Sequence, residues 1–146
     1  MVFKPLDSGF RERVAESFAR QKAMALIGAS LKRVAAGEVE IALPYREDLT
    51  QQKGFIHGGI LGMIADTACG YAAFSLMPAG GSLVTVEYKM NILAPARRSL
   101  VAQGKVVRPG RTLTVARAEV YADDGAHVAT MQQTLMALPD RPDTPE

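Results

Sequence analysis

One stretch of the sequence, residues 54–77, is apolar on every side, and shorter alternating segments surround it. Between residues 54 and 86 the only formally charged residue is Asp66. A helix that is apolar all round is buried on all its faces, and Pro78 followed by Gly80 ends it. The pattern therefore predicts a buried central helix of roughly 18 residues, about 27 Å long.

Six other segments are strand-like, and the two-residue alternation that is typical of half-buried strands is clear in residues 38–43 and 83–93. They are residues 29–34, 38–43, 83–93, 100–108, 113–121 and 127–138. The first two flank Gly37 and read as a hairpin, and Asp124-Gly125 marks a second hairpin turn. Within residues 83–93, simple alternation places Thr85 and Glu87 on one side and Tyr88 on the other.

The order of these segments predicts the class of fold. A first helix is expected over residues 11–18 with Ser8 as its N-cap. Two strands, the long helix and four strands of an expected meander follow, which is an α+β arrangement. We expect residues 1–138 to form a single domain, and the polar, Pro-rich tail 139–146 to be disordered.

Composition and charge exclude several classes of function. Seventeen basic and fifteen acidic residues leave a net charge of only +2, which is not the strongly basic charge of a nucleic-acid-binding protein. The single cysteine, Cys69, excludes an intrachain disulfide and a Cys-rich metal site, and we expect it to be a small buried side chain. Only two histidines are present, so a His-rich metal site is not expected. The charge of Asp66 argues against a membrane span, and the N-terminus has no secretion signal, so we expect a cytoplasmic protein without a membrane partner.

Asp66 is the leading candidate for chemistry. A carboxylate in an apolar helix costs free energy unless it is paired, hydrogen-bonded or faces a polar cavity. Such a group can act as a nucleophile or as a general base, and the sequence does not choose between them. The structural alternative is a helix carboxylate bonded to backbone amides.

The start of the central helix, His57-Gly58-Gly59, is a second candidate. The first amides of a helix have no intrahelical partner, and glycines let a ligand oxygen approach them closely. The positive end of the helix favours an oxygen that gains negative charge, as in an oxyanion hole. The alternative is a Gly-Gly turn that only lets a loop enter the helix.

Several motifs resemble those of the PaaI-type hotdog thioesterases, over roughly residues 18–138. They are Gln51-x-x-Gly54-x-x-His57-Gly58-Gly59 with Ala65-Asp66 after it, residues 85–96, and residues 107–112. The resemblance implies the hotdog fold, an α+β fold whose antiparallel β-sheet wraps around one long central helix. It also implies hydrolysis of acyl-CoA thioesters to free acid and CoA, without a metal or a cofactor, by a homodimer or a dimer of dimers.

The same resemblance implies a role for each matching residue. Asp66 corresponds to the catalytic carboxylate, and the Gly58 N–H to the oxyanion donor. Gln51 corresponds to the amide that helps to hold the carbonyl or the water, and Thr85 to a hydroxyl that positions the water in some relatives. His57 is expected to shape the loop through hydrogen bonds. Because Gly58 and Asp66 lie far apart on one helix, the site is expected at the dimer interface, with each subunit giving one side.

Substrate-binding residues are expected around the basic turn. Arg111 is the first candidate for the CoA phosphates because a guanidinium fork suits phosphate oxygens. Arg108 and Arg97-Arg98 are further candidates, and Gly110 and Gly59 provide backbone close to the substrate. The acyl group itself, aryl or medium-chain aliphatic, is not specified by the sequence.

Two other functions compete with the thioesterase. A hotdog module that binds acyl-CoA without turnover usually needs an attached DNA-binding segment, and nothing before Phe18 is long or basic enough to be one. A hotdog dehydratase would need a catalytic His paired with an acid in a different setting from His57 and Asp66.

Overall fold

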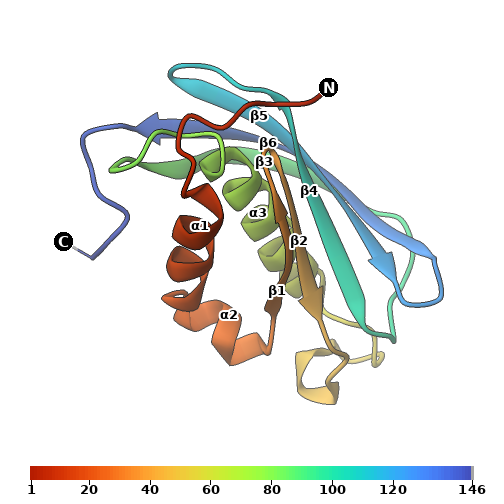
Figure 1. The fold of residues 1–146 in the computed structure, drawn as a ribbon. Coiled ribbons are helices and arrows are strands. Elements are labelled where there is room, and N and C mark those ends of the chain that lie inside the picture. The colour runs from red at the N-terminus through yellow and green to blue at the C-terminus, as the bar shows by residue number, and fades with distance from the viewer. Residues whose placement is uncertain (146) are drawn as a thin grey trace.

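The computed structural model describes residues 1–145 and shows one antiparallel sheet that curves around a long helix (Figure 1). The helices are α1 (Phe10–Ala19), α2 (Lys22–Ile27), α3 (Gly58–Phe74) and the 3-10 turn η1 (Glu47–Leu49). The strands are β1 (Ser30–Ala35), β2 (Glu38–Leu43), β3 (Ser82–Ile92), β4 (Leu100–Arg108), β5 (Leu113–Ala122) and β6 (His127–Leu138). This is the α+β arrangement that the sequence predicts.

The helix α3 is the centre of the core. It is 17 residues long, and eleven of them are buried. Buried side chains on β2, β4, β5 and β6 pack against it, among them Ile41, Val106 and Val120. The approach is closest at Gly104 of β4, where an added Cβ would lie 2.3 Å from the carbonyl carbon of Ala68. The glycine therefore lets the backbone of α3 rest directly on the sheet.

The strand order differs from the expected meander. The order across the sheet is β1-β2-β4-β5-β6-β3, so β4, β5 and β6 form a meander but β3 pairs with β6. The strands β2 and β4 are neighbours although α3 and β3 separate them in the sequence. Two strands, β1 and β3, are left at the edges of the sheet.

Near the N-terminus one prediction is wrong and one helix was not predicted. The N-cap of α1 is Gly9 rather than Ser8, and no side chain caps the helix. The Asp7 carboxylate accepts from the Gly9 N–H at 2.9 Å. The short helix α2 was not expected, because six residues are too few for a helical period to stand out. It ends at Gly28 in the left-handed conformation, and its Met24 is buried.

The segment after β6 turns at the end of that strand and passes down the side of the molecule next to α1 (Figure 1). Its Asp143 forms an ion pair with Arg20 at 3.0 Å and accepts a hydrogen bond from Ser17. All helices and strands in the described residues lie between Phe10 and Leu138. The division into a domain over 1–138 and a disordered tail over 139–146 stays a prediction, and Glu146 lies outside the described residues.

Candidate active site

Asp66 lies in the middle of α3 and is half-buried. One of its oxygens, Oδ1, accepts two hydrogen bonds: the hydroxyl of Thr85 donates to it at 2.7 Å, and the side-chain amide of Gln133 also donates to it. Within residues 1–145, no partner is recorded for the second oxygen, Oδ2. The carboxylate is therefore oriented through one oxygen while the other is left for a reactant.

Gln133 is the functional residue that the sequence reasoning missed. It lies on β6, is fully buried, and its amide nitrogen also donates to the Thr85 hydroxyl at 2.7 Å. Its own oxygen, Oε1, is buried and has no hydrogen-bond partner within the described residues. Its position within the strand could have revealed it. Met131 and Leu135, two residues before and after Gln133, are buried, and alternate residues of a strand share a face. A polar side chain at 133 therefore lies on the core-facing side of the strand.

A β-bulge in β3 brings Thr85 to α3. The pairing of β3 with β6 shifts register between Thr85 and Glu87. Beyond the bulge, the Tyr88 hydroxyl lies over α3 at Gly62, whereas Glu87 points away and accepts from Thr134 at 2.6 Å. Thr85 and Tyr88 thus share a face, which corrects the simple alternation, because a bulge adds one residue and turns a side chain to the other face.

A cavity of about 200 Å³ opens beside Asp66. Gly70 and Phe74 follow Asp66 at four-residue steps on α3 and line it. Nothing lies within 4 Å of where a Cβ at Gly70 would be, so the glycine leaves room in the cavity. Tyr71, Leu83, Thr85, Gln21 and Asp143 are among the other lining residues.

The start of α3 leaves one glycine amide available. The ring of His57 caps the helix, and its Nδ1 accepts from the Gly59 N–H at 2.8 Å. His57 is exposed, and its part in this structure is that of a cap. The Gly59 amide is thereby used, and among residues 1–145 no partner is recorded for the Gly58 amide.

Gly58 faces a different cavity from Asp66. This second cavity has a volume of about 290 Å³ and is lined by Gln51, Gly58, Leu61 and Ile92, among others. The side-chain oxygen of Gln51 accepts from the Lys53 N–H, which leaves its amide N–H groups for another partner. Asp66 and Thr85 do not line this cavity. Within one chain the structure pairs Asp66 with Thr85 and Gly58 with Gln51, and keeps the two pairs apart.

The candidate arginines lie in different places. Gly110 and Arg111 line a large, mostly apolar cavity of about 610 Å³ together with Leu6 and Met77. Arg108 is exposed at the end of β4. Beside the Gly58 cavity the arginine is instead Arg97, whose guanidinium lies 4.4 Å from the ring centre of Phe55 and donates to the Lys53 carbonyl at 2.8 Å.

Three further observations concern a cysteine nucleophile, a metal site and a membrane span. Burial raises the pKa of the Cys69 thiol, and the negative charges of Asp66 and Glu119 raise it further, so this cysteine is not an activated nucleophile. The described part of the chain does not bring three His, Cys, Asp or Glu side chains together as metal ligands. Between residues 1 and 145, no helix is both long and apolar enough to cross a membrane.

Comparisons with known proteins agree with the fold. The thioesterase superfamily model matches residues 53–129. A candidate esterase of Halobacterium salinarum is 35% identical over 120 residues, which cover 79% of this chain and 78% of the relative. A thioesterase family protein of Silicibacter pomeroyi is 50% identical, covers 89% of this chain and 98% of its own, and superposes with a TM-score of 0.86.

The hotdog fold is confirmed by the same comparisons. The PaaI protein of the Escherichia coli phenylacetic acid degradation operon superposes with a TM-score of 0.84, over 91% of this chain and 96% of its own. Its sequence is only 19% identical, so this likeness concerns the fold alone.

Proposed function

Because the chain belongs to the thioesterase superfamily, we propose that it hydrolyses acyl-CoA thioesters to a free acid and CoA. A hydrolase of thioesters or esters is what the family and the esterase relatives support in general. The observation that carries the finer proposal is the Asp66 carboxylate. It is half-buried in an otherwise uncharged helix, oriented by Thr85 and Gln133, and open to a cavity through its second oxygen.

Asp66 has two routes to the same products. As a nucleophile, Oδ2 bonds to the thioester carbonyl carbon, the C–S bond breaks, CoA leaves as a thiolate, and water hydrolyses the resulting anhydride. As a general base, Oδ2 takes a proton from a water that attacks the carbonyl, and the proton passes to the departing thiolate. The cavity beside Asp66 suits the acyl group in either route.

The Gly58 amide is proposed as the oxyanion donor. It lies at the positive end of α3 with no recorded partner in the described residues, and Gln51 shares its cavity. Asp66 is eight residues further along the same helix, about 12 Å along its axis. A donor must lie about 2.7–3.1 Å from the oxyanion, so we propose that Gly58 and Gln51 of one subunit complete the site of Asp66 and Thr85 of another.

The edge strand β3 is the proposed interface. Four large apolar side chains on it are 43% to 54% exposed: Val84, Val86, Tyr88 and Ile92. An exposed apolar edge strand pairs readily with another strand. Two copies of β3, paired antiparallel about a two-fold axis, would cover these side chains and give two equivalent sites. Pairing of two such dimers into a tetramer is compatible with this interface.

CoA is proposed to lie near Arg97, with Arg111 as the second candidate. Arg97 packs on Phe55, which lines the Gly58 cavity, so its guanidinium is near the proposed carbonyl site. Arg111 is exposed and lines the large cavity on another side of the molecule. A guanidinium held flat on a ring still presents its edge to phosphate oxygens.

Thiol release from a panel of aryl and medium-chain acyl-CoAs tests the proposal. Wild-type protein should release thiol, and Asp66→Ala and Asp66→Asn should lower the rate by at least the ~10²–10⁴-fold typical of losing a general base. Asp123→Asn, which alters an exposed carboxylate beside Arg98, is the matched control. Near-full turnover by a folded Asp66→Ala would refute the role of Asp66. Binding of acyl-CoA by the wild type without any thiol release would instead favour the non-catalytic module.

A further inference from the structure

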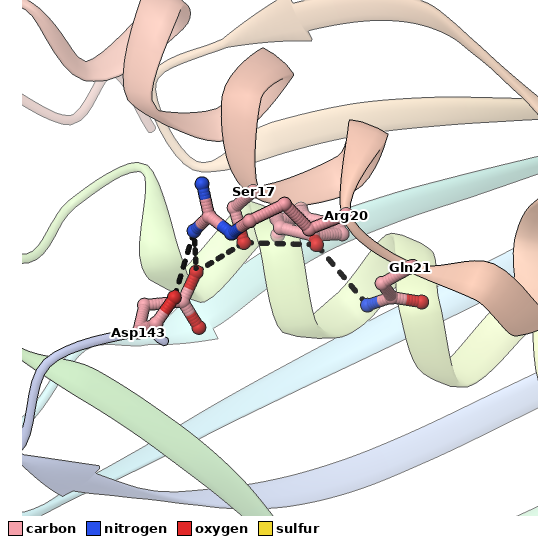
Figure 2. Close-up of polar contacts among 5 residues, drawn as sticks. Ser17, Arg20, Gln21 and Asp143 are labelled. Atoms are coloured by element: carbon pink, nitrogen blue, oxygen red, sulfur yellow. Dashed lines mark hydrogen bonds and ion pairs between the residues drawn. The ribbon is translucent and has the colours of Figure 1, made fainter. Parts of the chain in front are cut away.

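Asp143 holds the C-terminal segment against α1. Figure 2 shows its carboxylate between Arg20 and Ser17. Arg20 donates both to this carboxylate at 3.0 Å and to the Asp143 carbonyl at 2.7 Å, so the backbone is held as well as the side chain. Ser17 is buried, with 6% of its surface exposed. The anchor thus joins the tail to the edge of the core.

Asp143 also forms part of the wall of the Asp66 cavity. A separate hollow of about 340 Å³ adjoins the same segment and is lined by Ser17, Arg20 and Pro142, among others. Three residues line both spaces: Gln21, Leu83 and Asp143. The two spaces therefore adjoin at these three residues, and Asp143 is the one that belongs to the C-terminal segment.

The inner surface of this wall is polar. The amide of Gln21 donates to the Tyr71 hydroxyl at 3.1 Å, and Tyr71 lies 3.0 Å from the Ser17 hydroxyl. A carboxylate only accepts hydrogen bonds, so Ser17 donates to Asp143 and Tyr71 donates to Ser17. Burial raises the pKa of Tyr71, which keeps this proton in place. The chain of bonds fixes each of these side chains.

Volume and polarity both limit what fits between Asp66 and this wall. An apolar cavity of about 150 Å³ holds benzene, and the Asp66 cavity is about 200 Å³. It therefore has room for one aromatic ring or a short aliphatic chain. A longer alkyl chain would press on the polar groups of Gln21 and Asp143 without replacing their contacts with water, which is unfavourable.

We infer that Asp143 is a specificity-determining residue: the anchored segment 139–145 closes the outer end of the acyl cavity and limits the acyl group to about the size of one aromatic ring. This inference rests on the proposed thioesterase function. Releasing the anchor joins the cavity to the hollow behind it, so longer chains gain room. The core does not depend on the anchor, because both charged partners are well exposed and the segment lies outside the sheet.

The test compares butyryl-, hexanoyl-, decanoyl- and dodecanoyl-CoA with wild type, Asp143→Ala and Asp140→Ala. Asp140 lies in the same segment and does not line the cavity, so Asp140→Ala is the matched control. Wild type and the control should favour the short chains. In Asp143→Ala the ratio of kcat/KM for decanoyl- over butyryl-CoA should rise about tenfold or more, because two newly buried methylene groups already strengthen binding by about that factor.

A second variant, a chain that ends at Pro139, removes the segment and should shift the ratio at least as far. Thermal melting checks that both variants stay folded. An unchanged chain-length profile in the two folded variants would overturn the inference. Wild-type protein that accepts dodecanoyl-CoA as well as butyryl-CoA would also overturn it, since the cavity would then not limit chain length.

The outcome is separable from that of the proposed function. If wild type hydrolyses neither this series nor the aryl acyl-CoAs, the proposed function fails, but calorimetric binding of the same thioesters still tests the wall. Tighter binding of decanoyl-CoA to Asp143→Ala than to wild type or to Asp140→Ala supports the inference. Equal binding to all three proteins overturns it.

Discussion

At the residue scale, the orientation of Asp66 depends on two donors that share a single oxygen. Thr85 comes from the edge strand β3 and Gln133 from its neighbour β6, and they also bond to each other. The sequence motif led to Asp66 and Thr85, but nothing in a motif led to Gln133. Gln133 is distinguished only by its place on the apolar side of β6. This place can be recognised as unusual once it is known which side of the strand faces the core.

We predict that the two donors act together. Thr85→Val and Gln133→Met preserve side-chain volume but remove the donors, so Asp66 turns out of position, and each variant should lower kcat by up to about 100-fold with a smaller change in KM. Because the donors bond to each other, the double variant should lose less than the product of the single losses. Steady-state kinetics on all four proteins measures this coupling. Fully multiplicative losses, or an unchanged kcat in the folded single variants, would show that the contacts do not orient Asp66.

A second prediction isolates the Gly58 N–H. Gly58 is the first residue of α3, where proline is well accommodated, and His57 has ψ 137°, as a residue before proline requires. Gly58→Pro therefore removes the amide donor and retains the helix, whereas Gly58→Ala keeps the donor. Both add a Cβ near the tip of Ile92.

The expected difference is large. Losing an oxyanion donor costs about 10²–10³-fold in kcat, so Gly58→Pro should be slower than Gly58→Ala by about that factor, with a smaller change in KM. Stopped-flow or steady-state thiol release on the two variants measures it. Equal kcat values would assign Gly58 a packing role only.

At the element scale, the close contact of α3 with β4 sets the geometry of the site. A Cβ at Gly104 would lie 2.3 Å from both the carbonyl carbon and the carbonyl oxygen of Ala68, which are backbone atoms that cannot rotate away. Asp66 lies two residues before Ala68, so the same contact fixes its height above the sheet. The sequence marks residue 104 only as a glycine inside a strand, which indicates a close approach but not the partner.

Paired glycine variants test this contact. Gly104→Ala should lower the free energy of unfolding by about 1–3 kcal/mol or more, since overpacking forces the backbones apart. Gly70→Ala adds the same atom to α3 where nothing lies within 4 Å, and should raise stability by about 0.5–1 kcal/mol. Urea denaturation of both variants gives the comparison. A Gly104→Ala protein as stable as wild type would mean that the helix does not rest on β4 so closely.

Most elements could be predicted because their signals are local. The strands over 38–43, 100–108 and 127–138 match the predicted bounds, since alternation and turn residues both lie within each segment. The bulge in β3 could not be predicted in this way, because an extra residue leaves the composition unchanged and only pairing with β6 reveals it. The same holds for the hydrogen bond from the Gly9 N–H to Asp7 before α1, which depends on the loop geometry.

At the scale of the whole molecule, the order of the strands in the sheet could not be predicted from the sequence. Pairing of β3 with β6 and of β2 with β4 joins segments far apart in the chain, and apolar alternation does not state which strand is whose neighbour. The order has a functional consequence: it leaves β3, which carries Thr85, at an edge where a second subunit can reach the site.

The last prediction concerns that second subunit. If Gly58 of one chain serves Asp66 of the other, two inactive variants should restore each other. Asp66→Ala retains an intact Gly58 side, and Gly58→Pro retains an intact Asp66 side, so a heterodimer contains one complete site. When the two variants are mixed randomly in equal amounts, half of the dimers are heterodimers. Each heterodimer has one intact site out of two, so the mixture should recover up to about a quarter of wild-type activity per chain.

The control and the geometry make the outcome decisive. Mixing Asp66→Ala with Asp66→Asn disables the same side twice and should recover nothing, while native mass spectrometry confirms that subunits exchange in both mixtures. An attacking group must come within about 3–3.5 Å of the carbonyl carbon, yet in one chain Asp66 and Gly58 line separate cavities. No recovery despite proven exchange would require a single chain to bridge that separation, and the shared site would then be wrong.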